Sequence, residues 1–293
     1  MNKPVKKIGS ALCLYHDDAD GRCGAAIVRK AWGRGVVFQP IDYGDPVPWD
    51  IVEKVEQVVI TDFSLPKEPM ERIMATTSLI WIDHHKSSLE NLAELEDVPG
   101  RREIGRAGCV LTWEYFFPEE EVPRAVIYIG DRDVWRHEFP ETKPFGEGLF
   151  HEDSRPENDQ LWEKLLGDDE ELVRELIERG QLLFDARVKS IERRIEKFGF
   201  EVEFEGHKTL AVNGPCSGEL GEAIRKRGYT VGYCYVEAEQ NGDVMTFVTL
   251  YSDQIDVSEI AMKFGGGGHE GAAGFSFQRT DLPFPKMASV KKI

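Results

Sequence analysis

The segment "LIWIDHHKSS", Leu79 to Ser88, changes abruptly from apolar to polar residues. Its first part, Leu79 to Asp83, predicts a buried strand, because a short apolar run bounded by polar residues is typical of a strand covered on both faces. Asp83, His84 and His85 follow at the tip, and all three side chains can bind a metal ion. Such a triplet is weak evidence alone, so its meaning depends on partners elsewhere in the chain.

Two other segments of the first half have the same character. "ALCLY", Ala11 to Tyr15, and "VVITDFS", Val58 to Ser64, also predict buried strands that end at or just before an acidic or histidine residue. Segments with helical character lie between and after the strands: Gly24 to Gly33, Glu71 to Thr77, Ala107 to Phe117 and Arg124 to Trp135. Strands that alternate with helices predict an α/β domain with a mostly parallel sheet and helices on both faces. Ligands in such folds bind beyond the carboxyl ends of the strands.

Acidic and histidine residues gather at these predicted strand ends. They are His16, Asp18 and Asp20 in "HDDADG", Asp62 in "ITDFS", Asp83, His84 and His85 in "IDHH", and Asp131 and Asp133 in "GDRD". Each motif alone could be a turn, a helix cap or a solvated charge pair. Together, carboxylates this crowded repel one another unless cations neutralise them. The set offers more ligands than one ion needs, which favours two metals that share a carboxylate.

The second half of the chain differs in pattern. Glu157 to Phe198 is rich in charge, with apolar residues at helical spacing, and predicts two or more helices, the last from Gly180 to Phe198. They either join two domains or pack on the first one. From Phe200 onward strand patterns return, which predicts a smaller α+β domain. We therefore divide the chain into a metal-binding catalytic domain (1–150), a helical linker (151–199) and a substrate-binding domain (200–293).

A glycine-rich segment, "KFGGGGHEGAAGF", runs from Lys263 to Phe275. It could be a flexible linker, but the apolar tail that follows favours a binding loop. Open backbone N–H groups in such a loop can hold a phosphate or a nucleotide. The expected binding residues are Gly265, Gly266, Gly267, Gly268 and His269. The small residues after His269 predict the start of a helix.

Composition limits the possible partners. The 293 residues include 53 acidic and 36 basic side chains, a formal net charge of −17. This balance disfavours a binder of long nucleic acid but allows a small phosphorylated ligand held through divalent ions. The five cysteines contain no CxxC pair, which favours a reduced, cytoplasmic protein. No apolar run is long enough to span a membrane, and no signal-peptide cleavage site follows the basic start.

Four motifs in order, "HDDADG", "VVITDFS", "WIDHH" and "YIGDRDVW", resemble the metal-binding motifs of the DHH phosphoesterase family. "GGGGHEGAAGF" resembles the signature of the family's DHH-associated C-terminal domain. The resemblance extends from about Ala11 to Phe275. The family includes nanoRNases, pAp phosphatases, linear and cyclic dinucleotide phosphodiesterases, RecJ exonucleases and manganese pyrophosphatases.

The resemblance implies a role for each motif residue. His16, Asp18 and Asp62 would hold one metal, and a second would be held by Asp20, Asp62, His84 and Asp131, with Asp133 as the alternative. Asp83 would orient the site and His85 would face the phosphate, while the glycine loop and His269 would bind the nucleotide. Two departures stand out. The first motif is spaced HxDxD where many members have HxxxDxD, and Tyr251-Ser252 stands where many have Arg-Ser.

We therefore expect a hydrolase that uses two divalent ions, manganese first and magnesium as the alternative, to cleave short oligonucleotides, pAp-like nucleotides or dinucleotides. A cleft between the domains would measure substrate length, with a hinge in the Glu157 to Phe198 region. The alternatives are a RecJ-like single-strand exonuclease and a non-catalytic nucleotide-binding regulatory module. A homodimer is left open.

Overall fold

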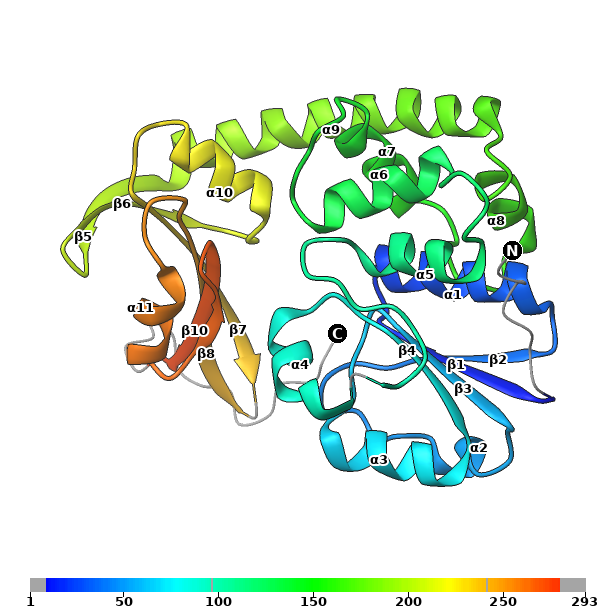
Figure 1. Cartoon of the computed structure of the whole chain (residues 1–293). Helices are drawn as coiled ribbons and strands as arrows, with labels where there is room; N and C mark the ends of the chain where they lie inside the picture. The colour runs from blue at the N-terminus through cyan, green and yellow to red at the C-terminus, as the bar shows by residue number, and fades with distance from the viewer. Residues whose placement is uncertain (1–8, 96, 241, 280–293) are drawn as a thin grey trace. The chain divides into compact units, whose positions relative to one another are not determined.

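A computed structural model describes residues 9–95, 97–240 and 242–279 of the chain (Figure 1). The chain divides into two compact units, residues 1–184 and 185–293. The boundary falls inside one long helix, α9 (Glu170–Phe198).

The first unit is built on a four-stranded sheet in the order β2-β1-β3-β4, in which every neighbouring pair is parallel. The strands are β1 (Ala11–Tyr15), β2 (Val36–Pro40), β3 (Gln57–Thr61) and β4 (Ser78–Ile82). All five residues of β1 and of β3 are buried, as expected for strands covered on both faces. The strands predicted at β1, β3 and β4 are confirmed. β2 is an edge strand that the sequence reasoning missed.

Helices cover both faces of this sheet, as predicted (Figure 1). One core contains Cys13 and Tyr15 of β1 and the helices α1 (Ala19–Trp32), α5 (Gly108–Phe116), α6 (Arg124–Asp133), α7 (Thr142–Phe150) and α8 (Asp159–Leu165). The opposite core contains Leu12 and Leu14 of β1 and the helices α2 (Trp49–Val52), α3 (Lys67–Thr76), α4 (Lys86–Asn91) and η1 (Ala93–Leu95). Alternate residues of β1 thus enter different cores, because successive side chains of a strand point to opposite faces.

The start predicted for the last helix before Phe200 is wrong. α9 begins at Glu170 and continues without a break to Phe198, so Gly180 lies inside it. A Cβ at Gly180 would lie 1.8 Å from the carbonyl oxygen of Pro144 in α7. The glycine is therefore explained by the close packing of α9 on α7 and does not mark a helix start.

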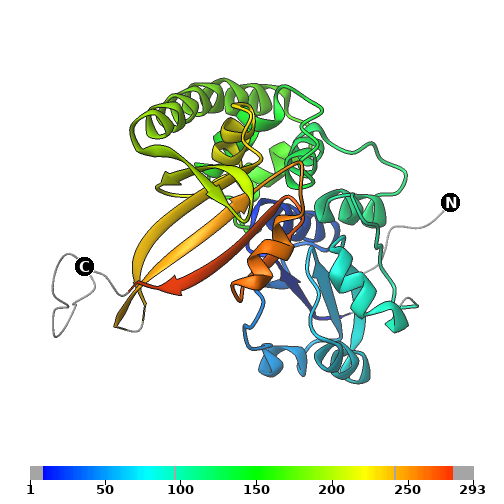
Figure 2. The same ribbon diagram turned by 90° about the vertical axis from the view of Figure 1, so that its left-hand side faces the viewer.

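The second unit contains a six-stranded mixed sheet in the order β5-β6-β7-β8-β10-β9. The strands are β5 (Gly199–Phe204), β6 (His207–Asn213), β7 (Val231–Gln240), β8 (Asp243–Tyr251), β9 (Gly267–His269) and β10 (Ala272–Gln278). Only β6 and β7 of these neighbours pair in parallel, and Figure 2 shows the long strands β7, β8 and β10 side by side. The helices α10 (Gly218–Arg225) and α11 (Val257–Lys263) complete two small cores. A smaller α+β unit was predicted here and is confirmed.

The helix start predicted after His269 is wrong, because the segment forms the hairpin of β9 and β10. Ala273 and Phe275 are buried while their neighbours are more exposed. This period of two suits a strand on a half-covered sheet. Gly268 has a φ of +145°, and a Cβ there would lie 2.6 Å from the Cα of Ala273, so the hairpin requires glycine at this position.

Candidate metal centre

Three neighbouring strands deliver the central residues of the site. Tyr15, Thr61 and Ile82 are the last residues of β1, β3 and β4 and lie in register. His16, Asp62 and the Asp83-His84-His85 triplet therefore emerge together at one edge of the sheet. Asp62 has a φ of +56° and donates its backbone N–H to the Ile82 carbonyl oxygen at 3.0 Å. A left-handed backbone is tolerated by aspartate and is frequent at functional sites.

Helix α1 adds two carboxylates. Asp18 is its N-cap and accepts a hydrogen bond from the Gly21 N–H at 2.9 Å. Asp20 is buried in the first turn, and its carboxylate accepts hydrogen bonds from the N–H groups of Gly108 and Cys109 at 2.6 and 2.9 Å. A Cβ at Gly108 would lie 2.6 Å from the Cβ of Asp62. The start of α5 can approach the two carboxylates this closely because residue 108 has no side chain.

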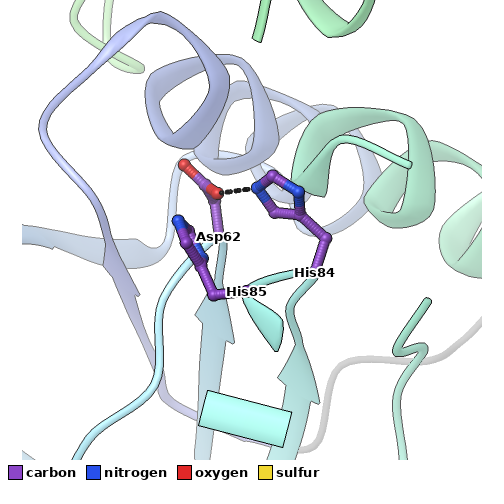
Figure 3. A group of neighbouring side chains, drawn as sticks. All are labelled: Asp62, His84 and His85. Carbon is purple, nitrogen blue, oxygen red and sulfur yellow. Dashed lines mark hydrogen bonds and ion pairs between the residues drawn. The ribbon is translucent and has the colours of Figure 1, made fainter. Parts of the chain in front are cut away.

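The ligand atoms form three overlapping groups, and the atoms of each group lie within 4.8 Å of one another. The groups are His16, Asp18 and Asp62; Asp62, His84 and His85; and Asp20, His84 and Asp133. Figure 3 shows the second group, in which His84 Nε2 lies 3.1 Å from Asp62 Oδ1. Asp62 and His84 each belong to two groups, so the three groups form one continuous set of ligands.

Asp83 lies beneath this set and is fully buried. Its Oδ1 accepts hydrogen bonds from the backbone N–H groups of His84 and His85 and lies 2.7 Å from His85 Nδ1. Its Oδ2 accepts a hydrogen bond from the Ser64 hydroxyl, which in turn accepts one from the Trp81 indole. The carboxylate therefore fixes the imidazole of His85 with Nε2 away from it.

The two aspartates of the fourth motif have different positions. Asp131 accepts hydrogen bonds from the Thr142 hydroxyl and from the backbone N–H groups of Glu138 and Phe139, and it is in none of the ligand groups. Asp133 Oδ2 lies 3.4 Å from His84 Nε2. The structure thus brings Asp133, our alternative, to the cluster and leaves Asp131 as the cap of the turn after α6.

Buried ligand atoms without hydrogen-bond partners indicate that the cluster suits metal ions. Among the described residues, His16 Nδ1, Asp62 Oδ2 and Asp133 Oδ2 are buried and lack such a partner. Buried polar atoms are nearly always paired, so three unpaired ones in one cluster need an explanation. Imidazole and carboxylate groups in this number fit one or more divalent cations.

Electrostatics within the cluster point the same way. Burial raises the pKa of Asp62 to about 7, and burial together with the charge of Asp20 raises that of Asp133 to about 7. The neighbouring carboxylate of Asp18, with Oδ2 3.0 Å from His16 Nδ1, and that of Asp62 raise the pKa of His16 to about 10. Without cations the cluster therefore retains protons at neutral pH, and metal ions would displace them.

The glycine-rich segment belongs to the second unit. His269 is exposed on β9, which pairs with β10 at the edge of the sheet. Tyr251, at the position where many DHH proteins have arginine, is only 8% exposed, and its ring packs against Gly221 of α10. The Ser252 hydroxyl donates to the Thr230 carbonyl oxygen. Tyr251 is thus a core residue of this unit.

Sequence reasoning missed the residues that support the ligands. Ser64 holds Asp83, and the backbone of Gly108 and Cys109 holds Asp20. Ser64 follows Asp62 by two positions and could have been suspected. No sequence pattern links Asp20 to the backbone N–H of Gly108, which lies 88 positions later in the chain.

Comparisons with known proteins bear on the family. No family model matches the chain. Uncharacterized protein R106 of Acanthamoeba polyphaga mimivirus is 30% identical over 244 residues, which cover 79% of this chain and 56% of the relative. The chain thus matches little more than half the length of that relative. Oligoribonuclease NrnB of Bacillus subtilis is 24% identical over 290 residues, 90% of this chain and 72% of the relative.

The fold has solved counterparts. An exopolyphosphatase-related protein from Bacteroides fragilis superimposes with a TM-score of 0.51 at 13% identity, over 93% of this chain and 88% of that one. The four motifs of the chain resemble those of the DHH phosphoesterase family, and its fold is similar to that of the exopolyphosphatase-related protein. The ligand groups described above are formed by residues of the four motifs that resemble those of the DHH family, with Asp133 in place of Asp131. None of the helices in the described residues is both long enough and apolar enough to cross a membrane.

Proposed function

We propose that the chain is a two-metal phosphoesterase that hydrolyses short oligonucleotides, pAp-like nucleotides or dinucleotides. The observation that carries this proposal is the continuous set of ligand atoms around the buried Asp62, three of which lack hydrogen-bond partners. The similarity to an oligoribonuclease supports the substrate class, and the net charge of −17 favours short anions over long ones.

The proposed ligands divide into two sets that share Asp62. His16, Asp18 and Asp62 would hold one ion, and Asp20, Asp62, His84 and Asp133 would hold the other. Asp133 replaces Asp131 in this assignment because Asp131 already accepts three hydrogen bonds elsewhere. Two divalent ions, manganese in first place and magnesium as the alternative, would supply positive charge to the phosphate and to the attacking water.

His85 has a separate role in this proposal. Asp83 binds its Nδ1 and raises its pKa to about 9, so the ring carries a proton on Nε2 at neutral pH. Nε2–H then donates a hydrogen bond to a phosphate oxygen and stabilises the charge that develops on it. Because Asp83 is buried and held by Ser64, the ring is oriented before the substrate arrives.

The glycine-rich hairpin of the second unit is the proposed site for the nucleotide end of the substrate. Gly265, Gly266, Gly267 and Gly268 leave the backbone accessible, and the exposed His269 imidazole can donate to a phosphate or a base.

A substrate panel tests the proposed function. The protein is freed of metal, loaded with manganese or magnesium, and incubated with pAp, RNAs of a few residues, linear and cyclic dinucleotides, and long single-stranded DNA. We expect manganese-dependent release of phosphate or mononucleotide from the short substrates and two ions per chain by elemental analysis. One ion or none at saturating manganese contradicts the two-metal assignment. Preferred digestion of long DNA would favour a RecJ-like exonuclease, and nucleotide binding without hydrolysis a regulatory module.

A further inference from the structure

A cavity of about 480 Å³ in the first unit opens beside the candidate metal ligands. Asp18, Asp20 and Asp133 form one side of it, and α6, α7 and the turns after them form the other. Its volume lies within the range of roughly 300–1,000 Å³ that is typical of small-molecule sites. The residues on the side away from the carboxylates have no role in the metal centre.

Trp135 is the first of these residues. It is 55% exposed and has a φ of +54°, a conformation that bulky residues rarely adopt. The turn is held in place by Asp131: its carboxylate accepts hydrogen bonds from the backbone N–H groups of Glu138 and Phe139, and its backbone carbonyl oxygen accepts one from the N–H of Arg136. A buried carboxylate thus maintains a strained turn that presents a large ring at the cavity. Strain of this kind is concentrated at binding sites.

Phe150, at the end of α7, is the second aromatic residue of the wall and is 75% exposed. Neither ring belongs to the cores of the first unit. Exposed aromatic rings that line one cavity beside polar groups are the usual means of binding a planar base, because every base can stack on them.

Two arginines supply positive charge to the same cavity. Arg22 Nε lies 2.7 Å from Asp17 Oδ1, and its Nη1 donates to the Ser154 hydroxyl at 3.2 Å. Arg132 lies 3.6 Å from Glu147 Oε1 and crosses Gly146, where a Cβ would lie 2.1 Å from Nη1. Both side chains are held in position, yet about a third of each is exposed, 31% and 34%.

The guanidinium group pairs with phosphate oxygens through two parallel hydrogen bonds. The aspartates on the opposite side of the cavity repel an anion until cations neutralise them. A ligand that suits this cavity therefore combines a planar ring with a phosphate and is bound when metal is present.

We propose that this cavity binds one nucleotide of the substrate, with its base stacked on Trp135 and Phe150 and its phosphate held by Arg132 and Arg22. This inference rests on the proposed function and adds to it a subsite for the nucleotide next to the scissile phosphate. It makes Trp135 a determinant of specificity for substrates that carry a base at that position.

The test compares Trp135→Ala with the parent on a dinucleotide and on two analogues in which either the 5′ or the 3′ base is replaced by hydrogen. Stacking of one base is worth roughly 1–3 kcal/mol, so KM for the dinucleotide should rise about 5- to 150-fold. On one of the two abasic analogues the variant and the parent should have equal KM. Trp135→Phe should retain most of the affinity. Met74→Ala, an exposed apolar residue on α3, serves as the control.

A binding measurement separates this inference from the proposed function. Calorimetric titration with AMP and manganese should give weaker binding for Trp135→Ala and for Phe150→Ala than for Met74→Ala. If the parent hydrolyses dinucleotides but both aromatic variants match the control in KM and AMP affinity, the subsite is wrong and the proposed function stands. If the parent hydrolyses no nucleotide, the proposed function is wrong. The AMP affinities of the two aromatic variants, compared with that of Met74→Ala, then test the subsite by themselves. Melting temperatures identify any variant that fails to fold, and Phe150→Ala then replaces Trp135→Ala.

Discussion

Asp83 Oδ1 lies 2.7 Å from His85 Nδ1, and the same oxygen accepts the backbone N–H groups of His84 and His85. These contacts fix the direction of the His85 ring. The buried carboxylate of Asp83 belongs to none of the three ligand groups. Asp83 therefore acts on the site through the His85 ring and through the backbone of His84 and His85.

Asp83→Asn should lower kcat/KM by about 10- to 100-fold, the usual loss when a group that orients a ligand or catalytic residue is changed. His85→Ala should lower it at least as much. Since the two residues act as one unit, the double variant should be no worse than His85→Ala alone. Steady-state kinetics of the three variants check this, and additive losses would show that Asp83 has a separate function.

Asp131→Ala and Asp133→Ala should separate stability from metal binding. Asp131 holds the turn after α6, and its loss leaves a buried hydroxyl and two N–H groups without their acceptor, which should cost about 1–3 kcal/mol of unfolding free energy. Asp133→Ala should keep the metal-free stability and lose manganese. Denaturant unfolding and elemental analysis of both variants test the pair. The reverse pattern would restore Asp131 as the ligand.

The metal-free protein should lose stability as pH rises from about 4 to about 7. The pKa values of Asp62 and Asp133 are raised to about 7 in the folded protein, chiefly by burial, from 3.8. In this window the folded state binds more protons than the unfolded state, so the unfolding free energy falls with increasing pH. Manganese should remove most of the decline, and Asp62→Asn should reduce it without metal. Melting temperatures across this range that rise in the metal-free parent would contradict the prediction.

His269→Ala should impair nucleotide use and leave manganese affinity unchanged, because His269 belongs to the second unit and is in none of the ligand groups. If its contact acts equally on ground and transition states, KM rises and kcat stays the same; if it aligns the scissile phosphate, kcat falls as well. Unchanged kinetics on every nucleotide would make the glycine-rich hairpin a purely structural element.

Cys216 should be the most reactive thiol among the described residues. A hydrogen bond from Cys234 lowers its pKa to about 6, whereas Cys13, Cys23, Cys109 and Cys234 are buried. Alkylation by iodoacetamide, followed by mass spectrometry, should show a rate that rises with a midpoint near pH 6. Cys234→Ala should move the midpoint toward about 8.5, the value of an ordinary thiol. A parent midpoint already near that value would refute the assignment.

The sequence predicted the elements whose pattern is purely local. β1, β3 and β4 are continuous apolar runs, and each ends beside a ligand residue, so both the sheet and most of the site could be expected. β2 escaped notice because only the first of its five residues is buried and its Val37 is 45% exposed, so it lacks a buried apolar run. The glycine-rich hairpin was mistaken for a helix start because small residues serve both structures.

The helical spacing of the fourth motif already distinguishes Asp133 from Asp131, although our choice of Asp131 as the ligand did not consider it. On α6, Asp133 follows the buried Ile129 and Gly130 by four and three positions and therefore shares their helix face. Asp131 lies on another face and turns to Thr142. The supporting contacts of Asp20 depend on chain segments 88 and 89 positions apart, which only the folded structure brings together.

The left-handed turn that carries Trp135 and His137 has a consequence for protein engineering. Glycine or asparagine in place of Trp135 would relax the backbone at no cost in core packing, because the Trp135 ring is in neither core, and replacing a strained residue of this kind is a common route to a more heat-resistant protein. A library screened for thermal resistance alone would therefore accumulate substitutions of Trp135. These variants would unfold at higher temperatures but bind nucleotides less well. Screening should therefore alternate selection for thermal stability with an assay of turnover.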